Sequence, residues 1–132
     1  MATENVGELV LFVEDELDIS DGYRLDLEHY GGGRYAGLVA PTLHEARELV
    51  ESPGLCGVIV DGRVPETPGA SIPSGRPTTL DFVRGVRTKR PNLIMVAASS
   101  NPDSTAQLVD AGCNAGVGKL LAVETLLRLL EG

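Results

Sequence analysis

Short apolar runs that alternate with segments of helical spacing are the feature that most constrains the fold of this chain. The first run, Leu9–Val13, contains no polar residue and ends abruptly at Glu14. An unbroken apolar run of this length is typical of a strand that is buried on both faces of a parallel sheet. By the same reasoning we expect strands over 9–13, 35–40, 55–60, 93–98 and 115–118, and helices over 17–30, 42–50, 80–87, 101–111 and 123–132.

Five strands that alternate with five helices predict an α/β fold, with a doubly wound parallel sheet covered on both faces. The flavodoxin-like (βα)5 arrangement with strand order 2-1-3-4-5 is the leading topology for five strands. Ligands of such folds bind outside the carboxyl ends of the strands. Because the chain has 132 residues and shows no internal repeat or dividing linker, we expect residues 1–132 to form a single domain.

Charge and hydropathy exclude several classes of function. The chain carries 19 acidic and 11 basic residues, a formal net charge of −8, whereas proteins that bind a phosphate backbone need clustered Lys and Arg. No apolar run approaches the ~20 residues that span a bilayer. Residues 1–5 contain neither the basic flank nor the apolar stretch of a secretory signal. We therefore expect a cytoplasmic protein that binds neither nucleic acid nor membranes.

Acidic residues follow two of the expected strands. Glu14 and Asp15 come directly after the first strand, and Asp61 follows the third. In the 2-1-3-4-5 order these strands are neighbours, so the three carboxylates are expected to converge. Unpaired carboxylates repel one another, and Mg²⁺ resolves the repulsion because it takes oxygen ligands. Lys119 ends the fifth strand at the same edge and is a candidate electrostatic partner. The alternative is that these acids only begin loops or cap helices.

Three segments of the sequence resemble the signature blocks of response-regulator receiver domains, the phosphoacceptor modules of two-component signalling. The resemblance covers essentially the whole chain in order, and each block is weak by itself while the ordered set is specific. The blocks are Leu11-Phe12-Val13-Glu14-Asp15, Val58-Ile59-Val60-Asp61-Gly62-Arg63-Val64-Pro65 and Ala111-Gly112-Cys113-Asn114-Ala115-Gly116-Val117-Gly118-Lys119.

The resemblance implies a role for each matching residue. Asp61 matches the aspartate that accepts a phosphoryl group from a phosphohistidine on a sensor histidine kinase or phosphotransfer protein. Asp15 matches a direct ligand of Mg²⁺, and Glu14 matches an acid that acts through water. The backbone carbonyl of Arg63 matches the third protein ligand of the metal. Lys119 matches the lysine that contacts the phosphoryl group, and this set is coherent chemistry for a carboxylate nucleophile.

The match fails at the positions that switch conformation in receivers. Those domains resemble one another in a Thr or Ser at the end of the fourth strand, and the usual spacing from Lys119 places Ala97 there. Ser99 takes this position if the register slips. The aromatic residue of the fifth strand falls at Gly116, so both halves of the usual switch are absent. Leu120 stands where receivers have a proline, and we expect a trans peptide bond before it.

A long connection also departs from the resemblance. Residues 62–79 hold four of the eight prolines and three glycines. Receivers usually have about four residues between the proline that matches Pro65 and the next helix, whereas 66–79 contains about ten more. Long connections without regular structure are often functional. This one is expected either to cover the pocket or form a partner surface, or to be a tolerated surface insertion.

The leading interpretation is a receiver module that signals by contact with a downstream protein and is not a turnover enzyme. Because dimer contacts are common in receivers, a second copy of the chain is also a candidate partner. One alternative is a pseudo-receiver, a scaffold whose binding does not depend on phosphate. A less favoured one is a phosphatase with an Asp nucleophile, which needs a second Asp where this chain has Arg63.

Overall fold

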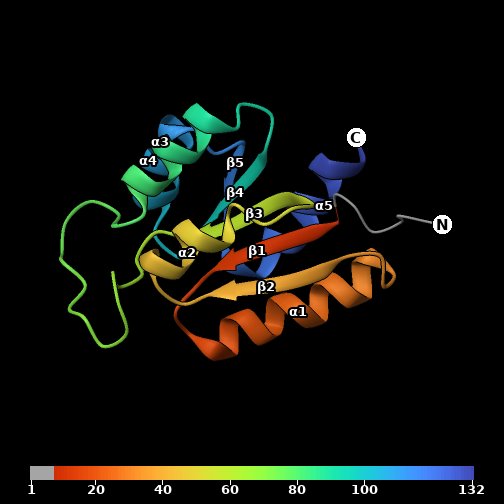
Figure 1. Ribbon diagram of the computed structural model, residues 1–132, viewed down its shortest axis with the longest axis horizontal. Helices are drawn as coiled ribbons and strands as arrows, with labels where there is room; N and C mark the ends of the chain where they lie inside the picture. Colours follow the sequence, from red (N-terminus) through yellow and green to blue (C-terminus); the bar gives the residue numbers. More distant parts are fainter. Residues whose placement is uncertain (1–7) are drawn as a thin grey trace.

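The computed structural model describes residues 8–132 and contains a five-stranded, fully parallel sheet (Figure 1). The strand order is β2-β1-β3-β4-β5, which confirms the expected topology. Residues 1–7, which include the segment 1–5 that we expected not to be a secretory signal, lie outside the described part. The strands are β1 (Leu9–Val13), β2 (Ala36–Ala40), β3 (Leu55–Asp61), β4 (Ile94–Ala98) and β5 (Ala115–Val117).

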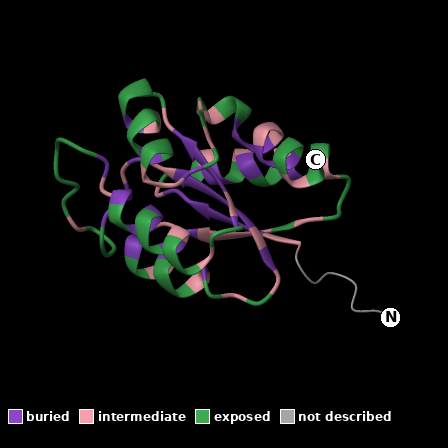
Figure 2. Ribbon diagram, turned by 90° about the horizontal axis from the view of Figure 1, so that it is seen from above, coloured by how far each residue is buried: buried purple, intermediate pink, exposed green. Residues whose placement is uncertain are grey.

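Five α-helices cover the two faces of the sheet, as expected. α1 and α5 pack on one face, and α2, α3 and α4 pack on the other. Figure 2 shows the buried strands between two helical layers whose outer surfaces are exposed. The helices are α1 (Leu17–Gly31), α2 (Leu43–Leu49), α3 (Leu80–Lys89), α4 (Pro102–Ala111) and α5 (Ala122–Glu131). Within residues 8–132, no helix is long and apolar enough to cross a membrane.

Alternation of side chains along each strand builds two cores. In β1, Leu11 and Val13 pack toward α2, α3 and α4, whereas Val10 and Phe12 pack toward α1 and α5. All four side chains are fully buried. A strand that is apolar on both faces fits only inside a sheet covered on both sides, which is why the unbroken apolar runs predicted this fold.

Local signals set the ends of several helices. The Thr42 hydroxyl accepts a hydrogen bond from the Glu45 N–H at the start of α2, and the Asn101 side chain accepts from the Asp103 N–H at the start of α4. Gly32 ends α1 with a φ of 62°, a conformation that favours glycine. One element was not expected. Lys119–Leu121 form a short 3₁₀ helix that leads into α5.

The segment 62–79 contains no helix or strand, as predicted. It leaves the carboxyl end of β3, projects beyond the sheet and returns to the start of α3 (Figure 1). No peptide bond within residues 8–132 is cis, so the bond before Leu120 is trans, as predicted.

Candidate functional site

The acidic site lies where β1 and β3 end side by side. Val13 pairs with Val60, so the next residues lie at the same level: Glu14 directly follows β1, and Asp61 is the last residue of β3. Glu14, Asp15 and Asp61 each offer a carboxylate oxygen, and these oxygens lie within 4.8 Å of one another. The structure therefore brings the three acids together as the sequence predicted.

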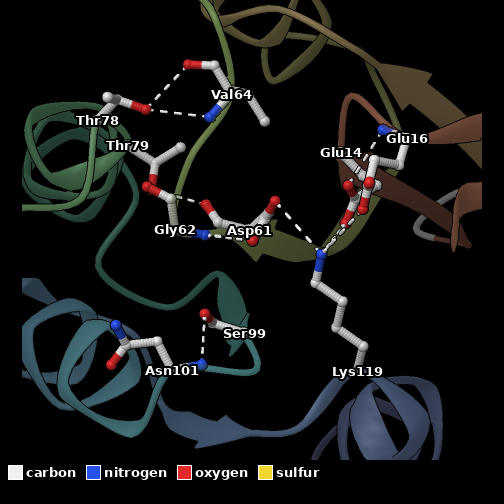
Figure 3. Close-up of polar contacts among 10 residues, drawn as sticks. All are labelled: Glu14, Glu16, Asp61, Gly62, Val64, Thr78, Thr79, Ser99, Asn101 and Lys119. Atoms are coloured by element: carbon white, nitrogen blue, oxygen red, sulfur yellow. Dashed lines mark hydrogen bonds and ion pairs between the residues drawn. The ribbon is translucent and has the colours of Figure 1, made fainter. Parts of the chain in front are cut away.

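Lys119 reaches this group from the end of β5 (Figure 3). Its Nζ lies 3.1 Å from Glu14 Oε1 and 3.5 Å from Asp61 Oδ2. Glu16, which the sequence did not single out, lies 3.9 Å from the same ammonium with a mostly exposed side chain. Burial by itself would lower the pKa of Lys119, but the charges of Asp61 and Glu14 outweigh it and raise that pKa. The lysine therefore stays charged beside the acids.

Glu14 is the most confined of the acids, with a side chain that is 0% exposed. Its Oε2 accepts a hydrogen bond of 3.1 Å from the Glu16 N–H, but its Oε1 has no hydrogen bond of good geometry within residues 8–132. Burial, and then the charge of Asp61, raise the pKa of Glu14 to about 7, although the Glu16 N–H and Lys119 act in the opposite direction. A buried carboxylate oxygen without a full partner favours an added cation.

The two carboxylate oxygens of Asp61 have different partners. Its Oδ1 accepts a hydrogen bond of 2.7 Å from the Gly62 N–H, and its Oδ2 faces Lys119. Burial raises the pKa of Asp61, and Lys119 and the Gly62 N–H partly oppose this. The site offers three carboxylates, and one of their oxygens, Glu14 Oε1, is buried without a hydrogen bond of good geometry from the described residues. Such a set of oxygen ligands fits a hard divalent cation such as Mg²⁺.

Arg63 lies two residues after Asp61, in the extended segment that follows β3. Its guanidinium does not enter the acidic site. It donates to the Pro73 carbonyl at 2.9 Å and also to the Gly75 carbonyl. The residue that the sequence singled out for its backbone carbonyl is thus tied by its side chain to the middle of the 62–79 segment.

Two threonines at the end of that segment were missed by the sequence analysis. The Thr79 hydroxyl donates to the Asp61 carbonyl at 2.7 Å, and the Thr78 hydroxyl contacts the backbone of Val64 (Figure 3). A Thr-Thr pair before an apolar helical run is typical of a helix cap, yet the Thr79 side chain caps nothing in α3. Both hydroxyls bond back to the chain beside the acceptor strand instead.

The predicted switch positions lie in one row of the sheet. Ala97 pairs with Val60 on one side and Gly116 on the other. Ala97 is fully buried in the core formed with α3 and α4 and brings no hydroxyl. A Cβ built on Gly116 would lie 2.8 Å from the Thr105 Cβ of α4, closer than real contacts allow. α4 therefore occupies the space beside β5 that any side chain at residue 116 would need.

Ser99 lies beyond the end of β4. Its N–H donates to the Val117 carbonyl, and its hydroxyl accepts a hydrogen bond of 3.0 Å from the Asn101 N–H (Figure 3). The Ser99 hydroxyl is thus already hydrogen-bonded to the residue that precedes α4. The structure places Ala97, and not Ser99, in the row that contains Gly116.

No family model matches this sequence, and no curated protein matches it either. Solved structures do match. A response regulator from Thermotoga maritima has a TM-score of 0.72 and 16% sequence identity, over 96% of this chain and 100% of that one. A CheY-like response regulator receiver domain protein from Methanospirillum hungatei JF-1 has a TM-score of 0.69 and 18% identity, over 94% of both chains. This chain has the receiver-domain fold.

A third similar structure is a response regulator protein from Burkholderia pseudomallei that holds a phosphorylated aspartic acid, a calcium ion and citrate. It has a TM-score of 0.68 and 18% identity, over 93% of this chain and 66% of that one. The receiver fold of the present chain thus confirms the resemblance that the sequence motifs indicated, including the (βα)5 architecture.

Proposed function

We propose that this chain is a receiver module that accepts a phosphoryl group on Asp61 with the help of Mg²⁺ and then signals through protein contacts. The observation that carries the proposal is the convergence of Glu14, Asp15 and Asp61 around the Lys119 ammonium. The Burkholderia pseudomallei protein with the same fold holds both a phosphorylated aspartic acid and a divalent cation, which supports this assignment.

In the proposed reaction, the Asp61 carboxylate attacks the phosphorus atom of a phosphohistidine on a sensor histidine kinase or phosphotransfer protein. An oxygen–phosphorus bond forms, the phosphorus–nitrogen bond breaks, and its electron pair leaves with the imidazole. The Lys119 ammonium next to Asp61 Oδ2 offsets negative charge on the transferred group. Asp15, Asp61, the Arg63 carbonyl and, through water, Glu14 would hold Mg²⁺, which supplies further positive charge when it is bound.

The test is phosphorylation by a small phosphodonor, such as phosphoramidate, with and without Mg²⁺. The intact mass should rise by one phosphoryl group only with Mg²⁺, and Asp61→Asn should abolish the gain. Asp110→Asn, at an exposed acid on α4, is the matched control and should behave as the wild type. The absence of any mass gain, or a gain that survives Asp61→Asn, contradicts the proposal.

A pseudo-receiver is the second candidate, favoured by Ala97 and by the contact of α4 with Gly116. In that case partner binding does not depend on phosphate. A titration with Mg²⁺ and beryllofluoride, followed by backbone amide NMR, separates the two candidates because only a phosphoacceptor binds both at Asp61. A phosphatase with an Asp nucleophile is disfavoured because the Arg63 side chain bonds within the 62–79 segment and offers no acid.

The remaining parts of the proposal concern context. We propose a single receiver domain over residues 1–132 that acts in the cytoplasm and is not a turnover enzyme. Its partners would be the phosphodonor protein, a downstream protein target and, in a dimer, a second copy of the chain. Neither nucleic acid nor a membrane belongs to the proposed set, in keeping with the net charge of −8.

A further inference from the structure

The end of the 62–79 segment folds back onto the last residue of β3 and onto the start of the segment itself, and it hydrogen-bonds there to Asp61, Gly62 and Val64. The Thr79 hydroxyl donates to the Asp61 carbonyl at 2.7 Å, with a weaker contact of 3.3 Å to the Gly62 carbonyl. The Thr78 hydroxyl accepts from the Val64 N–H at 3.0 Å and donates to the Val64 carbonyl at 2.9 Å. Thr79 and Val64 are both fully buried and Thr78 is half-buried, so water has limited access to these bonds.

The bond from Val64 to Thr78 fixes more than Val64. The Val64 N–H and the Arg63 carbonyl belong to one planar trans peptide, in which the two groups point in opposite directions. When the N–H is held on Thr78, the Arg63 carbonyl must point away from Thr78. Figure 3 shows Thr78 and Glu14 on opposite sides of Val64. Thr78 therefore orients the carbonyl that is the proposed third protein ligand of the metal.

The middle of the segment is bonded to Arg63, and its start is bonded to α2. The Arg63 guanidinium donates to the Pro73 and Gly75 carbonyls, so the candidate ligand residue also holds the projecting part of the segment. At the start, the Pro65 carbonyl accepts a hydrogen bond of 2.9 Å from the Leu43 N–H of α2. A tolerated surface insertion would need neither these bonds nor those of Thr78 and Thr79 to the backbone beside Asp61.

We infer that the 62–79 segment is part of the metal site, with Thr78 as the positioning residue for the Arg63 carbonyl. This inference rests on the proposed function. It has a reciprocal consequence: if the segment favours the metal-binding conformation of residues 61–64, then metal binding stabilises the segment by the same free energy. The order of the segment and the occupancy of the acidic site are thus linked.

The first test uses the wild-type chain and amide hydrogen exchange. Addition of Mg²⁺ should slow exchange at Val64 and at Arg76, Thr78 and Thr79, because metal binding holds the Arg63–Val64 peptide on Thr78. The amides of α5, which packs on the opposite face of the sheet from α3, are the internal reference: they should slow only by the overall stabilisation that Mg²⁺ gives, and the slowing at the segment should exceed it. Exchange that slows at the acids but not at residues 76–79 overturns the inference, and this readout requires no variant to fold.

The second test compares Mg²⁺ affinities by calorimetry. Thr78→Val removes the hydroxyl and should weaken Mg²⁺ binding by about tenfold, the low end of what residues that orient metal ligands contribute. Thr78→Ser restores the hydroxyl and should restore the affinity. Thr88→Val is the matched control, because Thr88 also donates to a backbone carbonyl in α3 but lies at an exposed position. Unfolding curves without Mg²⁺ report any general loss of stability separately.

The outcomes separate the inference from the proposed function. A wild-type chain that binds no Mg²⁺ contradicts the proposed function and the inference with it. A wild-type chain that binds Mg²⁺, together with a Thr78→Val variant of unchanged affinity, overturns the inference alone. If Thr78→Val does not fold, Arg63→Gln takes its place, since it keeps the ligand carbonyl and removes the bonds to Pro73 and Gly75. It should weaken Mg²⁺ binding several-fold, and an unchanged affinity overturns the inference.

Discussion

Two regions at the same edge of the sheet differ in how far they follow the receiver pattern. At the ends of β1 and β3, Glu14, Asp15 and Asp61 converge and Lys119 completes the charge arrangement. In β4 and β5, the positions that match the receiver switch by resemblance hold Ala97 and Gly116, and α4 lies against Gly116. The charged groups of the proposed phosphoacceptor site are thus present without the Thr or Ser and the aromatic residue that the resemblance led us to look for.

The contrast teaches that the two halves of a receiver have separate physical requirements. The acidic half needs only charges at the ends of neighbouring strands, which the sheet topology supplies. The responding half needs space into which an aromatic side chain can move, and that space is closed here by Thr105 of α4. A conformational response to phosphorylation would therefore need other residues to carry it. The hydrogen bonds of Thr78 to Val64 and of Thr79 to Asp61 connect the acceptor to the 62–79 segment and offer one such path.

The largest expected effect concerns the pH dependence of stability through Glu14. Burial and the charge of Asp61 raise its pKa to about 7 in the folded state, from a usual value of 4.5. The folded state then binds the proton more tightly than the unfolded chain does. The free energy of unfolding should therefore fall as the pH rises from about 4.5 to 7, by roughly 3 kcal/mol in the absence of divalent cations.

Glu14→Gln tests this expectation, because glutamine has the size of glutamate and does not ionise. Urea unfolding without divalent cations should show a flatter pH profile for the variant and a higher stability than wild type near neutral pH. Part of the slope should remain, since burial also raises the pKa of Asp61. Glu28→Gln, at an exposed site on α1, is the control. A wild-type pH profile in Glu14→Gln contradicts the assignment of the effect to this residue.

The second effect is stabilisation by Mg²⁺, which sharpens the contrast because it acts only on the acidic region. At a concentration 100-fold above its Kd, Mg²⁺ should raise the free energy of unfolding by about 2.7 kcal/mol. The gain should be smaller at acidic pH, because protons compete with the metal for Glu14 and Asp61. Asp15→Asn removes the proposed direct ligand and should lose most of the gain, whereas equal stabilisation of this variant counts against a metal site at these acids.

The third prediction addresses the closed region. Gly116→Ala places a Cβ 2.8 Å from the Thr105 Cβ, so α4 must shift, at an expected cost of about 1–3 kcal/mol in the free energy of unfolding. Gly118→Ala is the control, because a Cβ there meets nothing within 4 Å. It should be neutral or stabilising by up to ~1 kcal/mol. The Mg²⁺ affinity should not change in either variant.

An equal stability of Gly116→Ala and Gly118→Ala would show that α4 yields easily. In that case a side chain could move into the space beside β5. The two regions would then differ only in which residues they contain, and not in how tightly they are packed. Thermal unfolding of both variants in the same buffer decides between these outcomes.

The sequence predicted the fold and the acidic site because both follow from short-range patterns combined with topology. Apolar runs mark buried parallel strands, and the order of those strands brings Asp61 next to Glu14 without any knowledge of side-chain packing. The position of Lys119 could be predicted in the same way, because it also follows a strand at that edge. The sheet register Val60–Ala97–Gly116 then resolved the choice of row between Ala97 and Ser99 that residue spacing left open.

The features that sequence reasoning missed depend on contacts between distant residues in irregular segments. Thr78 bonds to Val64 across 14 residues without periodic structure, and no local signal distinguishes it from a helix cap. The contact of Gly116 with Thr105 depends on how closely α4 approaches the sheet, which is a property of packing. The 3₁₀ helix Lys119–Leu121 was likewise not marked by any spacing of apolar residues.

The smallest expected effect is that of Ser99→Ala, which tests whether the closed region keeps a hidden hydroxyl switch. The Ser99 hydroxyl accepts the Asn101 N–H in a partly exposed position, so its loss should cost only about 0.5 kcal/mol of stability. Phosphorylation by phosphoramidate and the lifetime of the product should equal those of the wild type and of Ser100→Ala, an exposed neighbour. A markedly altered lifetime in Ser99→Ala alone would mean that this hydroxyl reaches the phosphoryl group. The row of Ala97 and Gly116 would then no longer define the switch, and the two regions would differ less than their residues indicate.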